Sequence, residues 1–204
     1  DVLFLLEHPP TLTIGKTGRM ENILVPVSRL RKERITLFFS GRGGDVTYHG
    51  PGQLVAYPIL SLKSRGKDVH LYVRHLEEVA IRTLKDFDIT AVRDKSHPGV
   101  WIGMEEIAAI GLSIKRWVSM HGLALNVNSN MAHFSFINPC GFTHRKATSM
   151  ARVLGCKVPM RAVMSKFIHY FSEVFEITME PGNHNELRSL YEKSLPRLDK
   201  MESA

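Results

Sequence analysis

Two segments indicate the architecture of this chain most clearly: Ile107-Ala108-Ala109-Ile110-Gly111-Leu112-Ser113-Ile114 and, shortly after it, His121-Gly122-Leu123-Ala124-Leu125-Asn126. Both are rich in aliphatic residues, and along the second one large apolar residues alternate with small or polar ones. That alternation is typical of a half-buried β-strand. We therefore expect strands at residues 107–114 and 121–128, preceded by a shorter one at 100–102.

The rest of the chain adds further strands and several helices. Runs of β-prone residues predict strands at residues 2–7, 35–40, 46–48 and 54–60. Helical spacing predicts a helix capped by Asp68, a short one that is capped by Thr148 and ends near Gly155, a long one that begins at Pro159, and a weaker one at 186–195. Sequential strands with helices before and after them predict an α+β fold in which a mixed β-sheet packs against helices.

Composition indicates an ordinary globular protein. The chain has 204 residues, of which 44% are hydrophobic, and no linker or repeat divides it. We expect a single domain over residues 1–204. It opens on an apolar strand without an initiator Met, so we also expect a preceding segment to be missing. No apolar run is long enough to cross a membrane and no signal peptide is present, which predicts a soluble protein without a membrane partner.

Cysteine content and charge narrow the environment and the partners. Cys140 and Cys156 lack metal-ligand spacing, so we expect no metal site and reduced, cytoplasmic surroundings, with an organelle left open. We interpret Cys156 as a packing residue. The net charge of +7 favours acidic partners. The basic residues are scattered and not interleaved with aromatic ones, which argues against nucleic acid; a solvated basic surface is the simpler alternative.

A glycine-rich stretch is a candidate binding loop. It reads Arg42-Gly43-Gly44-Asp45-Val46-Thr47-Tyr48-His49-Gly50-Pro51-Gly52-Gln53. Glycine lets backbone N–H groups approach a ligand closely. No Gly-Lys-Ser/Thr and no helix follows, so the stretch does not match a phosphate or dinucleotide loop. We interpret it as a wall for a carbonyl or acyl group, although two tight turns between strands would look the same.

Gly111 and Gly122 interrupt otherwise regular strands. A glycine inside a strand often marks a place where a ligand or another backbone approaches closely. The small residues at 108, 109 and 124 beside larger aliphatic ones would leave room for a narrow apolar channel. A β-bulge without any ligand is the alternative explanation.

Cys140 is the candidate nucleophile. It lies in Asn138-Pro139-Cys140-Gly141, where proline and glycine predict a constrained turn that leaves the sulfur accessible. A thiolate is the strongest nucleophile among ordinary side chains. A free cysteine is, however, more often a small buried hydrophobic residue than a catalyst.

Five of these segments together resemble one enzyme family. Residues 42–53, 98–101, 107–111, 121–126 and 137–141 follow the order and spacing of lipoyl(octanoyl) transferases of the LipB type, and the match runs from Leu6 to about Ser149. The resemblance implies the biotin/lipoate protein ligase-like fold, which is related to class II aminoacyl-tRNA synthetases. It implies a catalytic domain that moves an octanoyl group from acyl carrier protein to a lysine. We expect no cofactor, because the incoming thioester is already activated, and we expect a monomer. The acceptors would be the lipoyl domains of 2-oxoacid dehydrogenase E2 subunits and the glycine cleavage H protein.

The resemblance also assigns site residues. Cys140 would form the acyl thioester. The acyl group would be bound by Arg42, Gly43, Gly44, Asp45, Val46, Thr47, Tyr48, His49, Ala109, Ile110, Gly111, Gly122, Leu123 and Ala124.

Glu106 departs from the family pattern, because the family has a lysine here that is taken to lower the pKa of the cysteine. A free thiol has a pKa near 8.5, and a nearby carboxylate disfavours the thiolate. A compensating cation or base would have to come from elsewhere, and the candidates are His49, His121, Lys115 and Lys146. Alternatively, Glu106 accepts a proton from the incoming lysine.

Two other activities stay open. One is an amidotransferase that moves octanoyl or lipoyl groups between lipoyl domains, since relatives on the same fold do this with the same cysteine chemistry. The other, which Glu106 leaves open, is a weakly active or non-enzymatic acyl-binding homologue. An ATP-dependent lipoate ligase is less favoured, because the resemblance is to the cysteine-bearing branch.

Overall fold

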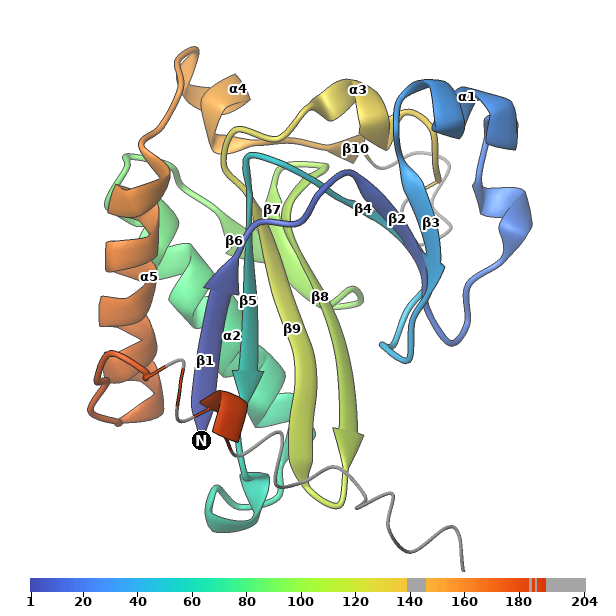
Figure 1. The fold of residues 1–204 in the computed structure, drawn as a ribbon. Coiled ribbons are helices and arrows are strands. Elements are labelled where there is room, and N and C mark those ends of the chain that lie inside the picture. Colours follow the sequence, from blue (N-terminus) through green and yellow to red (C-terminus); the bar gives the residue numbers. More distant parts are fainter. Residues whose placement is uncertain (139–145, 184, 186, 190–204) are drawn as a thin grey trace, which may run out of the picture.

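The computed structural model describes residues 1–138, 146–183, 185 and 187–189. Cys140 and most of the helix predicted at 186–195 lie outside the described residues. Within them the chain forms one large sheet covered by two long helices and a smaller sheet beside it (Figure 1). The α+β class expected from the sequence is therefore confirmed.

The large sheet has the strand order β1-β5-β9-β8-β7-β6, with β10 paired to β8. Neighbouring strands are antiparallel except β10, which runs parallel to β8. Their bounds are β1 Val2–Leu6, β5 Gln53–Ile59, β6 Val92–Arg93, β7 Gly99–Ile102, β8 Glu105–Lys115, β9 Val118–Asn126 and β10 Lys146–Ala147. The strands predicted at both ends of the turn 116–117 thus form one hairpin, β8–β9.

Two helices cover one face of this sheet. α2 (Val69–Lys85) and α5 (Met160–Phe175) pack against each other and against the sheet (Figure 1). Their shared core includes Leu76 and Leu84 from α2 and Phe167 and Phe171 from α5, all fully buried. Ile168, the residue after Phe167, is 39% exposed and marks the edge of the apolar stripe.

The smaller sheet has the order β3-β2-β4 and its own core. It is built from β2 (Thr11–Ile14), β3 (Thr36–Phe39) and β4 (Val46–His49), and it is accompanied by η1 (Met20–Asn22), α1 (Val27–Lys32) and α3 (Met131–Phe134). β2, α1, α3 and β10 were not predicted, since each is too short to show a clear period.

Helix ends follow the expected chemistry with one correction. Asp68 accepts a hydrogen bond from Leu71 N–H at 2.9 Å and so caps α2 as predicted. α4 (Met150–Leu154) ends at Gly155, whose φ of 73° is left-handed. Its cap is Ser149, which accepts from Arg152 N–H at 3.2 Å, and not Thr148. Thr148 instead donates its backbone N–H to the carbonyl of Glu106 at 2.9 Å.

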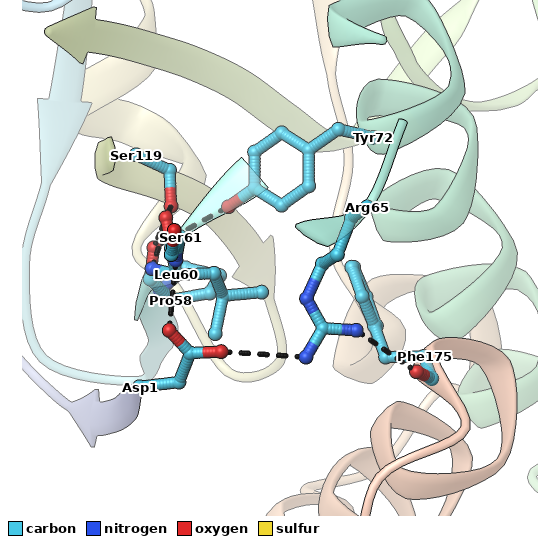
Figure 2. Close-up of polar contacts among 8 residues, drawn as sticks. All are labelled: Asp1, Pro58, Leu60, Ser61, Arg65, Tyr72, Ser119 and Phe175. Carbon is cyan, nitrogen blue, oxygen red and sulfur yellow. Dashed lines mark hydrogen bonds and ion pairs between the residues drawn. The ribbon is translucent and has the colours of Figure 1, made fainter. Parts of the chain in front are cut away.

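A cluster of polar contacts around Ser119, Arg65 and Asp1, here called the polar lock, connects the end of β5 to the N-terminus (Figure 2). Ser119 Oγ donates to Pro58 O at 2.7 Å and accepts from Leu60 N–H at 2.9 Å. Arg65, in the loop after η2 (Leu62–Ser64), bonds both to the Asp1 carboxylate at 3.3 Å and to the Phe175 carbonyl at 3.2 Å. This loop therefore ties β1, β5 and the end of α5 together.

Candidate active site

A narrow cavity lies where the small sheet meets β8 and β9. Its lining is mostly backbone and small or apolar side chains, with a few polar groups at the rim. The lining residues are Thr13, Ser40, Arg42, Gly43, Gly44, Thr47, His49, Val55, Tyr57, Ala109, Ile110, Gly111, His121, Gly122, Leu123 and Ala124. Segments from β2, β4, β5, β8 and β9 thus converge on one site.

Two glycines form the floor of this cavity. Gly111 on β8 is the direct cross-strand partner of Gly122 on β9. A Cβ on Gly122 would lie 2.1 Å from the carbonyl oxygen of Ala56, and one on Gly111 would lie 3.0 Å from Cδ of Arg42. Pairing along the whole hairpin is continuous. Of the two explanations offered by the sequence, close backbone approach holds and a bulge at these glycines does not.

Arg42 fastens the glycine-rich loop. Its side chain is buried, and its Nη2 donates to the carbonyls of Thr13 at 2.8 Å and Asp45 at 2.6 Å. Nη1 donates to Gly43 O at 2.9 Å and Nε to Thr13 Oγ1 at 3.1 Å. These hydrogen bonds connect the loop to β2. The guanidinium therefore fixes the wall of the cavity and also carries a positive charge there.

Histidines at the rim are held neutral. Burial lowers the pKa of His49 to about 4, its hydrogen bond to Gln53 (Nδ1 to Oε1, 2.8 Å) opposes that shift, and the Arg42 charge adds to it. Burial also lowers the pKa of His121, helped by the charges of Arg42 and Lys16. Both rings are therefore uncharged near pH 7, which suits an uncharged ligand.

Tyr57 lines the cavity, and His8 contacts Tyr57 from outside the lining. His8 Nε2 and Tyr57 Oη are 2.7 Å apart, and the His8 ring contacts the ring of His49 at a centroid distance of 5.7 Å. Burial lowers the pKa of His8 and raises that of Tyr57. The pair thus offers a neutral hydrogen-bonding edge beside the apolar floor.

Three of the residues expected to bind the acyl group do not line this cavity. Asp45 turns to the opposite side of the loop, where its carboxylate accepts from Arg19 N–H at 2.9 Å and from Asn22 Nδ2. Val46 and Tyr48 are buried in the core of the small sheet. Successive side chains of a strand point to opposite faces, so β4 presents only Thr47 and His49 to the cavity.

The sequence did not reveal several other lining residues. Thr13 lies on β2, a strand that was not predicted, and Ser40 follows β3. Val55 and Tyr57 lie on β5, a predicted strand, two positions apart. Their common face could have been inferred from strand periodicity, once Ala56 was known to pack inward.

Glu106 does not line this cavity but a second one beside it. Its backbone pairs with Ala147 of β10, and its side chain is largely buried. Of the four residues considered as compensating partners for the thiol, His49 and His121 line the first cavity. Lys115 and Lys146 are exposed and line neither.

Other observations concern the described part of the chain only. There, no group of three or more metal-ligating side chains could hold an ion. No described helix is both long and apolar enough to span a bilayer. Cys156 is exposed, so its interpretation as a packing residue was wrong.

Comparison with known structures identifies the fold. A Thermoplasma acidophilum protein of the lipoate protein ligase type, solved with bound lipoic acid, superimposes with a TM-score of 0.72 over 94% of this chain and 81% of its own, at 19% sequence identity. The fold is thus the biotin/lipoate protein ligase-like one.

Sequence comparison identifies the family. Residues 1–172 match the lipoyl protein ligase A/B catalytic domain, and the chain belongs to that family. It is 50% identical to an octanoyltransferase of Desulforamulus reducens over 88% of this chain and 79% of the relative. It is 51% identical to an octanoyltransferase of Caldicellulosiruptor saccharolyticus over 86% of this chain and 75% of the relative.

Proposed function

We propose that this protein transfers an octanoyl group from acyl carrier protein to a lysine of lipoyl domains, through a thioester on Cys140. The observation that carries the proposal is the narrow cavity over Gly111 and Gly122, with neutral polar groups at its rim, in a chain half identical to octanoyltransferases. The acceptors are the lipoyl domains of 2-oxoacid dehydrogenase E2 subunits and the glycine cleavage H protein.

The cavity suits a straight saturated chain. A floor without side chains at Gly111 and Gly122, flanked by Ala109 and Ala124, leaves a slot that we expect to hold one hydrocarbon chain. Each CH₂ group buried there contributes about 0.8 kcal/mol. His49 and His121 are neutral, so neither places a charged ring beside the acyl chain. A charged ring next to apolar groups would lose its hydration, which is unfavourable in free energy.

The first step loads the enzyme. The thiolate of Cys140 attacks the carbonyl carbon of the octanoyl thioester, a new C–S bond forms, and the C–S bond to the carrier breaks. The leaving carrier thiolate takes up the proton that Cys140 lost. No ATP is required, because a thioester is already an activated acyl group.

The second step unloads it. The neutral amine of the acceptor lysine attacks octanoyl-Cys140, a C–N bond forms and the C–S bond breaks. Starting from the ammonium, one proton stays on the amide nitrogen, one ends on the Cys140 sulfur and one is released to solvent. A thioester waits long enough between the two partners yet still reacts with an amine.

Charge supports protein partners of acidic character. Residues 15–45, which include η1, α1 and strand β3 of the small sheet, contain seven Lys or Arg and three Asp or Glu. Complementary charge accelerates encounter and is screened by salt. We expect the association rate with acyl carrier protein and with lipoyl domains to fall as ionic strength rises.

Intact-protein mass spectrometry tests the proposal directly. Incubation with octanoyl carrier protein should add one octanoyl group to the wild type and to Cys156→Ser, in which only the exposed second thiol is removed. Cys140→Ser should show no thioester adduct. An unmodified wild type, or an undiminished adduct on Cys140→Ser, would contradict the proposal.

The donor is tested separately. Transfer to a lipoyl domain should be efficient from octanoyl carrier protein and slow from an octanoylated lipoyl domain or from octanoate with ATP. Efficient transfer only from the octanoylated lipoyl domain would indicate an amidotransferase. Efficient transfer only from octanoate with ATP would indicate a ligase.

A further inference from the structure

A second cavity adjoins the first. It encloses about 330 Å³, against about 70 Å³ for the first. The two share Gly43, Gly44, Ile110 and Gly111, so they meet at the glycine-rich turn where it crosses β8. The remaining walls are Val69, Val73, His97, Pro98, Trp101, Glu106 and Leu112.

Most of this lining is apolar, with a carboxylate in it. Val69 and Val73 project from α2, Leu112 from β8 and Trp101 from β7. The titratable side chains of the described lining are His97 and Glu106. A cavity with aliphatic walls and one buried carboxylate is complementary to a long aliphatic side chain that ends in a cation.

The backbone is shaped to put the Glu106 carboxylate there. Trp101 pairs with Glu106 while Val100 pairs with Ala108, so β8 carries one extra residue at Ile107. A bulge of this kind re-aims the neighbouring side chain. It lets Ile107 enter the main core while Glu106 faces the cavity.

Gly99 makes room for the same carboxylate. A Cβ at Gly99 would lie 2.9 Å from Glu106 Oε1, and the φ of Gly99 is 145°, which favours glycine. Its N–H donates to Oε1 of the buried Glu77 at 3.1 Å, and Glu77 is in turn held by Arg93 Nε at 3.2 Å. Glu77 and Arg93 therefore hold the backbone of Gly99, which lies beside the Glu106 carboxylate.

We propose that this second cavity is the port for the acceptor lysine and that Glu106 receives its ammonium group. The inference rests on the proposed function and deepens it. The four methylene groups of the lysine lie between α2 and β8, and the nitrogen reaches Glu106 next to the turn that both cavities share. Glu106 attracts the ammonium and then accepts the first of its protons, which it passes to solvent, leaving the amine free to attack.

Glutamate suits this role better than the lysine that the family pattern would place here. A lysine at position 106 would repel an incoming ammonium, whereas a carboxylate attracts it. The same carboxylate does nothing to activate a thiol. Glu106 is thus expected to favour the second step of the transfer and not the first.

A double-mutant cycle on binding tests the port without any acyl transfer. The affinity of the unmodified enzyme is measured for an apo lipoyl domain and for the same domain with its acceptor lysine changed to glutamine. The wild type should prefer the lysine domain about tenfold, the size of one charge-assisted bond. Glu106→Gln should lose that preference.

Glu105→Gln is the matched control, because Glu105 is the adjacent carboxylate and pairs with Arg152 at 3.7 Å outside the cavity. It should keep the preference. If the wild type and Glu106→Gln prefer the lysine domain over the glutamine domain to the same extent, the proposed lysine port is wrong, whether or not Cys140 forms a thioester. Absence of the thioester with the preference intact would overturn only the proposed function.

A kinetic experiment locates the entry path. Preformed octanoyl-enzyme is mixed with apo lipoyl domain or with hydroxylamine, a small neutral nucleophile. Val73→Trp, which fills the cavity without changing charge, should slow release to the lipoyl domain at least tenfold and leave release to hydroxylamine and the first acylation unchanged. Unchanged release to the lipoyl domain, or equal slowing of all three reactions, would overturn the port.

Discussion

Gly111 and Gly122 face each other across the β8–β9 pair, and neither position has space for a methyl group. At Gly122 the obstacle is the carbonyl of Ala56 on β5, which is backbone within the sheet and cannot move aside. At Gly111 the obstacle is Arg42, a side chain that fastens the glycine-rich loop. Gly122 therefore allows the close packing of β9 against β5, and Gly111 leaves room for Arg42 in the wall of the cavity.

Gly111→Ala should separate these two roles. The added Cβ meets Arg42 Cδ at 3.0 Å and Gly43 O at 3.3 Å, which displaces the wall and narrows the acyl slot. We expect a folded protein whose rate of acylation by octanoyl carrier protein falls at least tenfold, with a smaller loss for a shorter acyl chain. Gly41→Ala is the control, since nothing lies within 4 Å of its Cβ position. An equal loss for both chain lengths would argue against a steric cause.

The buried histidine predicts a loss of stability in acid. An unfolded histidine titrates near pH 6.5, whereas His49 in the folded protein titrates near 4 because of burial. Between these values the unfolded state binds more protons, so the free energy of unfolding falls as pH drops from about 6.5 to about 4. The loss is roughly 3 kcal/mol at most and is absent above pH 6.5. His8 and His121 shift in the same direction.

Urea unfolding at pH 7.5 and pH 4.5 measures this loss. His49→Gln should reduce the difference between the two pH values, while His70→Gln, a change at an exposed position of α2, should leave it as in the wild type. A pH dependence unaltered in His49→Gln would show that other groups govern acid unfolding.

Much of the fold could be predicted from periodicity. The β8–β9 hairpin, β5, α2 and α5 are long enough for their apolar patterns to show, and Asp68 and Gly155 mark helix ends with residues whose local chemistry is specific. Some of the short elements, such as β10 and α3, depend on tertiary pairing and leave little local trace. Thr148 was mistaken for a cap because Ser149 follows it and either hydroxyl could serve.

The sequence indicated which segments form the site better than it indicated which way their side chains point. Both glycines and Thr47 line the cavity, whereas Tyr48 and Val46 alternate to the other face of β4. The bulge at Ile107 has no signal in the sequence, yet it decides which way Glu106 points. Whether Glu106 faced the acyl chain or another cavity therefore could not be deduced from the chain alone.

Ser119→Ala should weaken the lock near the N-terminus (Figure 2). Ser119 is fully buried, and its loss leaves the Leu60 N–H without its acceptor. An unsatisfied buried donor costs about 1–3 kcal/mol, so chemical denaturation should show a loss of that size. Ser113→Ala, at a half-buried position of β8, should change stability by less than about 0.5 kcal/mol. Equal effects of the two substitutions would contradict this account.

Glu106→Lys restores the residue expected from the family pattern and should affect the two steps in opposite directions. We expect the exchange of a negative charge for a positive one at position 106 to lower the pKa of the Cys140 thiol, and one unit raises the thiolate fraction nearly tenfold well below the pKa. The gain in acylation rate should be smaller than tenfold, because a less basic thiolate is also less nucleophilic. Release to the acceptor lysine should slow, since the new ammonium repels the incoming one.

Rapid-mixing mass spectrometry of both steps between pH 6 and pH 9 measures these changes. We expect the pH profile of acylation to move downward in Glu106→Lys and to stay in place in Glu105→Lys, where the charge changes equally but outside the cavity. An unchanged profile in Glu106→Lys would show that this position does not govern the thiol. The group that activates Cys140 would then have to be sought at the rim of the acyl cavity, where His49 and His121 lie, or at Lys115.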